Sequence, residues 1–138
     1  MMFYAVIDTN VLVSALLNIN SNPGIVLCSV FNGQTTPLIN TDILAEYREV
    51  LARKKFHFPK ETVDIILKRL ENSSLKTEEI PAEFPEVSDP KDRCFFAVTM
   101  AARQTEEALL ITGNIRHFPQ QPFVVTPAQF VEMLHNRA

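Results

Sequence analysis

The sequence contains little cysteine and no long apolar run. Its two cysteines, Cys28 and Cys94, lie far apart and form no Cys-x-x-Cys pair, so we expect buried free thiols. None of the three histidines stands at metal-ligand spacing from a cysteine, which argues against a zinc site. No apolar run reaches the roughly 18 residues of a membrane-spanning helix, and no basic segment precedes the apolar N-terminal stretch as in a signal peptide. We therefore expect a cytoplasmic protein that is not attached to a membrane.

Several enzyme motifs are also missing. The absence of a Gly-x-Ser-x-Gly elbow and of a Cys–His pairing argues against a serine or cysteine hydrolase. The absence of Gly-x-Gly-x-x-Gly and P-loop motifs argues against a nucleotide cofactor. Repeats, low-complexity tracts and interdomain linkers are missing too, and the Pro- and Glu-rich stretch "EEIPAEFPEVSDP" is typical of a loop. A length of 138 residues, 46% of them hydrophobic, predicts one domain, residues 1–138, around one core.

The chain is not basic overall. Its net charge is −3, which is unlike a typical nucleic-acid binder, although a local patch can carry phosphate contacts. One such stretch is "ARKKFHFPK", in which cations alternate with aromatic residues. It is a candidate RNA-binding patch, with bases stacking on the rings. The alternative is that the cations close a helix while the aromatic side chains pack beneath them. The candidate cations are Arg53, Lys54, Lys55 and Lys60.

Helical and strand patterns alternate along the chain. Because strands that alternate with helices favour a parallel sheet covered on both faces, we expect a Rossmann-like three-layer α/β/α sandwich with four to five parallel strands. The predicted strands are Phe3–Ile7, "TPLIN", "ALLIT" and "FVVT". The predicted helices run from Thr9 or Asn10 to Leu17, over "NPGIVLCSVFNG", over Asp42–Ala52 with Thr41 as its cap, after Pro59, from Pro90 to Gln104 with Asp89 as its cap, and over Pro127–Asn136.

Polar side chains stand at the ends of these elements. Asp8 ends the first strand, and Asn114 lies two residues after Thr112, which ends "ALLIT". Glu46 lies one turn into the helix after "TPLIN", and Asp92 lies in the first turn of the helix that leads to "ALLIT". Because functional crevices of open parallel sheets lie beyond the carboxyl ends of the strands, we expect these four side chains to meet there.

Carboxylates that meet in a crevice repel one another, so they share protons or bind a cation. Hard oxygen ligands without a thiolate or a paired imidazole favour Mg²⁺ or Mn²⁺. Such an ion commonly serves phosphate chemistry: it neutralises a phosphodiester, lowers the pKa of a bound water and supports in-line attack. The pattern therefore indicates metal-dependent phosphodiester hydrolysis.

The arrangement resembles the PIN domain, a family of small metal-dependent ribonucleases. The matching stretches are "IDTN", "ILAEYREVL", "DPKDRCFFAVTMAA" and "LLITGNIRHFP", and the likeness extends from Met1 to about Phe130. It is strongest to the toxin components of prokaryotic toxin–antitoxin pairs, where TGN followed by HFP is a familiar ending. The resemblance implies a four-residue acid site, single-stranded RNA as substrate, oligomers and inhibition by an antitoxin. Many PIN domains have Asp where this chain has Asn114, and another acid where it has Arg116.

The leading hypothesis is an endoribonuclease in which Asp8, Glu46 and Asp92 hold Mg²⁺ or Mn²⁺ and metal-activated water attacks the RNA. Asn114 completes the ligand set through its amide oxygen or a water, and the missing charge predicts one well-held metal and a weaker second. Homodimerisation is expected through the apolar helices. The remaining candidates orient a water or contact phosphate, and they are Thr9, Asn10, Asp89, Thr112, Arg116 and His117.

Structural roles and two other functions compete with this hypothesis. Asp8 can cap the following helix, Asp89 and Asp92 can serve a helix start, Glu46 can be solvated, and Asn114 can form a turn with Gly113. One alternative function is a catalytically weak or inactive RNA-binding module. The other is aspartyl-phosphate transfer at Asp8, since receivers and haloacid-dehalogenase-like phosphatases also place an Asp at a strand end.

Overall fold

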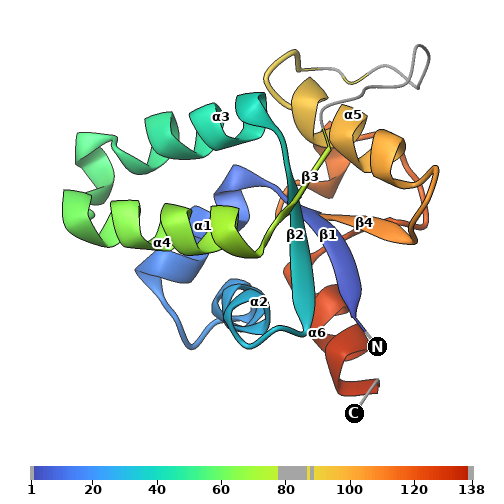
Figure 1. Ribbon diagram of the computed structural model, residues 1–138, viewed down its shortest axis with the longest axis horizontal. Coiled ribbons are helices and arrows are strands. Elements are labelled where there is room, and N and C mark those ends of the chain that lie inside the picture. The colour runs from blue at the N-terminus through green and yellow to red at the C-terminus, as the bar shows by residue number, and fades with distance from the viewer. Residues whose placement is uncertain (1, 78–86, 88, 137–138) are drawn as a thin grey trace.

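A parallel five-stranded sheet forms the centre of the protein (Figure 1). The structure is a computed structural model that describes residues 2–77, 87 and 89–136. The strand order is β3-β2-β1-β4-β5, and each neighbouring pair is parallel. The strands are β1 (Phe3–Ile7), β2 (Thr35–Ile39), β3 (Leu75–Lys76), β4 (Ala108–Ile111) and β5 (Val124–Val125).

Helices cover both faces of this sheet, which confirms the predicted three-layer α/β/α sandwich. One helix, α5, packs against β1, β2 and β4, whereas α2 and α4 pack against β2 and α2 also contacts α1 and α6. The chain moves outward from β1 to β3 and then returns to place β4 on the other side of β1. Because connections between parallel strands are right-handed as a rule, this change of direction places helices on both faces of the sheet. The helices are α1 (Thr9–Leu17), α2 (Asn22–Phe31), α3 (Thr41–Leu51), α4 (Lys60–Ser73), α5 (Arg93–Ala102) and α6 (Pro127–Asn136), with 3₁₀ turns η1 (Lys54–Phe56) and η2 (Ile115–His117).

The central strand β1 is buried along most of its length. Ala5, Val6 and Ile7 are at most 1% exposed, as expected for a parallel strand covered on both faces. At the other end of β1, Phe3 packs edge-on against Phe130 of α6, with ring centroids 5.1 Å apart. This burial means that any polar group at the carboxyl end of β1 enters an environment with little water.

Two predicted helix starts are wrong in detail. Asn40, not Thr41, caps α3: its Oδ1 accepts a hydrogen bond of 2.8 Å from the backbone N–H of Ile43. The next correction concerns Asp89, because α5 begins at Arg93 with Asp92 at the N-cap position. Asp89 instead accepts a 2.9 Å hydrogen bond from the N–H of Lys91, and such a local side-chain bond competes with helix formation.

Three other predictions differ from the structure. Strand β3 was not predicted, because its two residues are exposed and acquire strand geometry only by pairing with Leu38 and Ile39. Cys28 is exposed rather than buried, since α2 turns Val26, Leu27 and Val30 toward the core. Cys94 is half-buried, and burial raises the pKa of its thiol to about 12. The stretch expected to be a loop before Asp89 lies mostly outside the described residues.

The α1–α2 connection is a sharp corner. The axes of the two helices are bent by 101°, and no single helix in the described ranges is long and apolar enough to cross a membrane, although this bent pair has the necessary length and composition. Ser21 caps α2 by accepting a hydrogen bond from the N–H of Gly24 at 3.2 Å. A Cβ at Gly24 would lie 1.9 Å from the carbonyl oxygen of Ile19, so the corner requires glycine there.

Candidate active site

The candidate site lies where the strand order reverses. Asp8 follows β1 and Asn114 follows β4, and these two strands are neighbours at the centre of the sheet. The N–H of Asp8 extends their pairing by donating to the carbonyl of Ile111 at 2.9 Å. In open α/β sheets, ligands bind beyond the carboxyl ends of the strands at this reversal, because the connections leave in opposite directions there.

Asp8 is held by side chains from both connections. It is 5% exposed and occupies the N-cap position of α1, but its side chain makes no capping hydrogen bond. Its Oδ2 instead accepts hydrogen bonds from Thr112 Oγ1 at 2.7 Å and from Asn10 Nδ2 at 3.2 Å. The capping alternative therefore explains where Asp8 lies but not how its carboxylate is bonded.

The same two partners position the turn that carries Asn114. The hydroxyl of Thr112, which donates to Asp8, accepts a 2.9 Å hydrogen bond from the N–H of Asn114. Asn10 Oδ1 accepts a 3.0 Å hydrogen bond from the N–H of Gly113. Asp8 and the turn at Asn114 are thus joined by two short hydrogen-bonded links, although they are distant in the sequence.

Burial and mutual repulsion raise the pKa of the acidic side chains. Desolvation is the main reason why the pKa of Asp8 rises from 3.8 to about 6, and the charges of Asp92 and Glu46 raise it further, against the hydrogen bond from Thr112. Desolvation, followed by the charge of Glu49, raises the pKa of Glu46, and Asp92 adds to the same shift. The structure therefore brings Asp8, Glu46 and Asp92 within electrostatic reach of one another.

Asp92 faces a histidine and another acid. Its pKa is raised by desolvation and then by the charge of Asp89, whereas His117 lowers it. Asp92 Oδ2 lies 3.4 Å from His117 Nδ1, with the histidine side chain 54% exposed and that of Asp92 17% exposed. Asp89 itself is exposed. His117 is thus a neighbour of the acid group as well as a candidate phosphate contact.

The donor chemistry fits a hard cation. Two buried oxygens, Thr9 Oγ1 and Asp92 Oδ2, make no hydrogen bond to any described residue, although His117 Nδ1 lies 3.4 Å from the second. Buried polar atoms without a hydrogen bond usually have a ligand or a water as partner. Within the part of the chain that the structure describes, no group of three or more His, Cys, Asp or Glu side chains is already spaced to hold an ion. The ligand roles of Asp8, Glu46, Asp92 and Asn114 stay predictions.

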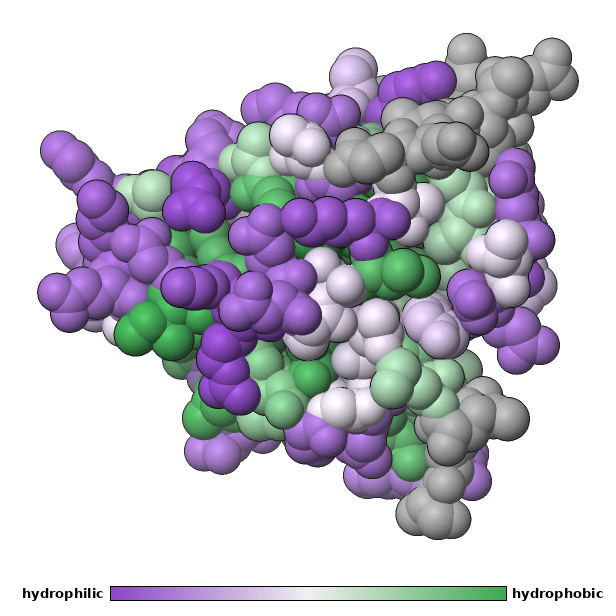
Figure 2. Space-filling model, in the orientation of Figure 1, coloured by the Kyte–Doolittle hydropathy of each residue, from purple (hydrophilic) through white to green (hydrophobic). Residues whose placement is uncertain are grey.

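The predicted basic patch lies at the connection between α3 and α4 (Figure 1). Hydrophilic side chains dominate this end of the molecule in Figure 2. Lys55 Nζ lies 5.1 Å from the centre of the Phe56 ring, and Phe56 stacks on Phe58. Arg53 pairs with Glu49 at 3.4 Å and is also near enough to lower the pKa of Glu46. The structure leaves RNA binding by this patch as a prediction.

Tyr47 supports the site through a hydrogen bond, whereas its spacing along the helix predicted only an apolar contact. Its ring is buried, and its hydroxyl donates a 2.5 Å hydrogen bond to the carbonyl of Ile7, directly before Asp8. This bond ties α3, and with it the neighbouring Glu46, to the end of β1. Lys91 is another neighbour that was not predicted, and its charge lowers the pKa of Glu46.

Comparison with known families matches the chain to one of them. The sequence model of the PIN domain covers residues 4–116, which include all four predicted acid-site positions. No curated protein and no solved structure matches the chain. PIN domains are generally nucleases and typically use divalent metal ions. Because the matched region is most of the chain and carries strands β1 to β4 with the acid positions at their carboxyl ends, the protein belongs to the PIN domain family.

Proposed function

We propose that the protein is an Mg²⁺- or Mn²⁺-dependent endoribonuclease that cleaves single-stranded RNA. The observation that carries this proposal is the burial of Asp8 at the reversal of strand order, within electrostatic reach of Glu46 and Asp92. An acid with a pKa raised by burial and by like charges gains most from a bound cation. Membership of a nuclease family supports the same reading.

Each side chain has a distinct part in this proposal. Asp8, Glu46 and Asp92 would hold the ion, and Asn114 would complete the set directly or through a water. An ion bound there would supply charge to neutralise the phosphodiester and would lower the pKa of a water. Thr112 and Asn10 keep the Asp8 carboxylate oriented through their hydrogen bonds.

An arginine and a histidine stand beside this group. Arg116 and His117 line a hollow of about 290 Å³ together with Asn114. Arg116 binds a phosphate oxygen and stabilises the charge that develops on it during attack. Neither residue forms a covalent bond to the substrate.

Cleavage of labelled single-stranded RNA with Mg²⁺ or Mn²⁺ tests the proposal. We expect the wild-type protein to cut and Asp8→Asn to be at least about 100-fold slower, since a lost metal ligand removes several kcal/mol of transition-state stabilisation. Asp64→Asn is the matched control: Asp64 is an exposed acid of α4 whose pairing with Arg48 at 3.4 Å is on the surface. Failure of the purified wild-type protein with both metals and several RNAs would contradict the proposal.

A non-catalytic RNA-binding module is the second candidate. It is favoured by Asn114 and Arg116, which occupy positions where many PIN domains have acids, and by the spacing of the described acids, which do not yet form a three-ligand group. In that case wild type and Asp8→Asn bind RNA equally well, and neither cleaves it.

We also propose that the protein is the toxin of a toxin–antitoxin pair and forms a homodimer. The resemblance of "LLITGNIRHFP" to such toxins supports the first part, and the exposed side chains of Leu17 and Ile19, 61% and 50% accessible, supply apolar surface for the second. Expression of wild type, but not of Asp8→Asn, is expected to arrest growth. A small protein from the neighbouring reading frame is expected to relieve the arrest. Light scattering of the purified protein measures the oligomeric state.

A further inference from the structure

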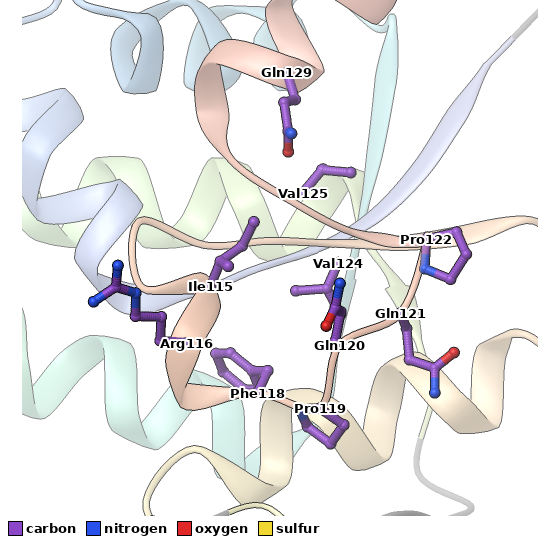
Figure 3. A pocket seen from close by; sticks show the side chains of 10 residues that line it. All are labelled: Ile115, Arg116, Phe118, Pro119, Gln120, Gln121, Pro122, Val124, Val125 and Gln129. Carbon is purple, nitrogen blue, oxygen red and sulfur yellow. The ribbon is translucent and has the colours of Figure 1, made fainter.

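A groove of about 570 Å³ runs beside the outer strand β5 (Figure 3). Its walls come from η2, the segment that follows it, β5 and the first turns of α6. Apolar side chains form part of the wall, and three glutamine side chains form another part. We call this the β5 groove, lined by Ile115, Arg116, Phe118, Pro119, Gln120, Gln121, Pro122, Val124, Val125 and Gln129.

The β5 groove adjoins the candidate active site. It shares Ile115 and Arg116 with the 290 Å³ hollow that Asn114 lines. A third hollow, of about 190 Å³, shares Gly113 and Asn114 with that one and reaches Asn10. The turn at Asn114, which Thr112 ties to Asp8, therefore contributes to the walls of adjoining hollows on both of its sides. An RNA chain with one phosphate at the acidic side chains would therefore pass next to the β5 groove.

The charges along these hollows change with position. Arg116 places a positive charge, and His117 an imidazole, at the junction beside Asn114. The rest of the β5 groove carries no ionisable side chain among its lining residues. A phosphate is therefore favoured at the junction and a neutral group in the groove, and a nucleotide presents these two parts side by side.

The glutamine amides suit the edge of a nucleobase. Gln129 Oε1 accepts a 2.9 Å hydrogen bond from the N–H of Thr126, which holds the amide and leaves its Nε2 to donate. Figure 3 shows this side chain extending from α6 toward Val125. Gln120 is exposed and Gln121 is half-buried, and both line the same groove. An amide both donates and accepts, as base edges require.

The size and the apolar wall agree with the same ligand. Sites for small organic ligands commonly measure about 300–1,000 Å³, so the groove has room for a base with its ribose. Val124, Val125 and Pro122 offer apolar contact to the face of a base, which gains free energy when it leaves water in this way.

We propose that the β5 groove binds one unpaired nucleobase next to the cleaved phosphate and that Gln120, Gln121 and Gln129 select its identity. This inference rests on the proposed ribonuclease function for its substrate. It adds a base-selecting site that the acid residues do not supply.

A double variant tests the selection of the base. Single-stranded RNAs that differ at one position are cleaved by wild type and by Gln120→Ala/Gln121→Ala. We expect wild type to prefer one base and the double variant to lose at least about 5-fold of that preference, as expected when specific base contacts are removed, while it still cleaves the disfavoured RNAs. Gln34→Ala is the matched control, because Gln34 is exposed and precedes β2, which lies on the other side of β1 from β5. An unchanged preference in the double variant, or no preference in wild type, overturns the inference and leaves the ribonuclease proposal intact.

A binding measurement separates the two proposals if no RNA is cut. Methyl resonances of Ile115, Val124 and Val125 are followed while hexamers of adenylate, cytidylate, guanylate or uridylate are added to the metal-free protein. Shifts that differ between hexamers and weaken in the double variant support the β5 groove even without cleavage. Binding that leaves these methyl groups unshifted, or no binding of any hexamer, overturns it.

Discussion

Thr112 links the two connections of the candidate site through a single hydroxyl group. The hydroxyl donates to Asp8 Oδ2 at 2.7 Å and accepts from the N–H of Asn114 at 2.9 Å. Its hydrogen bond opposes the rise in the pKa of Asp8 that burial causes. One fully buried threonine thus affects both the charge of Asp8 and the position of Asn114.

Thr112→Val is expected to lower RNA cleavage by about 10- to 100-fold, the usual cost of losing a partner that orients a metal ligand. The pKa of Asp8 should rise above about 6 without the donated hydrogen bond, so the acidic limb of the pH–rate profile should move to higher pH. Thr112→Ser, which keeps the hydroxyl, should restore both the rate and the profile. Equal behaviour of the valine variant and wild type in rate and pH profile would show that the hydroxyl has no positioning role.

The helix α3 carries Glu46 and is anchored at two points. Its N-terminus is capped by Asn40 Oδ1, which accepts from the N–H of Ile43 at 2.8 Å. One turn after Ile43, the Tyr47 hydroxyl bonds the carbonyl of Ile7. These bonds fix the start of α3 against the end of β1, and they thereby place Glu46 near Asp8.

Asn40→Ala is expected to lower the free energy of unfolding by about 1 kcal/mol, within the 0.5–2 kcal/mol range for lost helix caps. Asn40 is buried, so water does not easily replace the lost partner of Ile43. Asn40→Asp keeps the accepting oxygen and should recover part of this loss. Urea unfolding followed by circular dichroism measures both variants, and a stability of the alanine variant equal to that of wild type would contradict this role.

The protein as a whole holds its acids at a cost in stability. The pKa of Asp8 is 3.8 as an isolated group and about 6 in the fold. The folded state therefore binds more protons than the unfolded state between these values, and stability falls as pH rises through this window. The shift of about two units corresponds to about 3 kcal/mol of destabilisation at neutral pH. The raised pKa values of Glu46 and Asp92 act in the same direction.

The free energy of unfolding of Asp8→Asn is accordingly expected to exceed that of metal-free wild type by about 1–3 kcal/mol at pH 7. The difference should shrink as pH falls from about 6 to about 4, and it should vanish below that, where Asp8 is protonated in both folded and unfolded states. Thermal unfolding at a series of pH values measures it, with Asp64→Asn as the matched control. A difference that does not change with pH would show that Asp8 carries no raised pKa.

Divalent ions are expected to reverse this order. Mg²⁺ or Mn²⁺ at about 100 times its dissociation constant adds about 2.7 kcal/mol to the stability of a protein that binds it only when folded. Wild type should gain this stabilisation, and Asp8→Asn should gain little. Calorimetry in the presence of either ion or of a chelator measures the difference, and equal gains in the two proteins would place the ion elsewhere.

Local patterns were sufficient for most of the elements. Continuous apolar residues predicted β1 and β4, and helical spacing with caps and prolines predicted α1 to α4 and α6, because these signals act between residues a few positions apart. The predicted start of α5 was wrong because Asp89 can either cap a helix or form a local turn. In the structure it forms the turn, by accepting a hydrogen bond from the N–H of Lys91. Strand β3 was missed because its two residues depend on pairing with β2.

The residue types of the candidate site were also predictable from the chain, since acids at strand ends follow from the direction of parallel strands. Their connections were not. Asp8 and Thr112 are 104 positions apart, and no local sequence pattern predicts the hydrogen bond between the Thr112 hydroxyl and Asp8. The strand order places β4 beside β1, and this order also creates the β5 groove from segments with no periodic pattern. Periodicity thus decides which residues form helices and strands, whereas distances, pKa values and grooves arise only after distant segments pack together and exclude water.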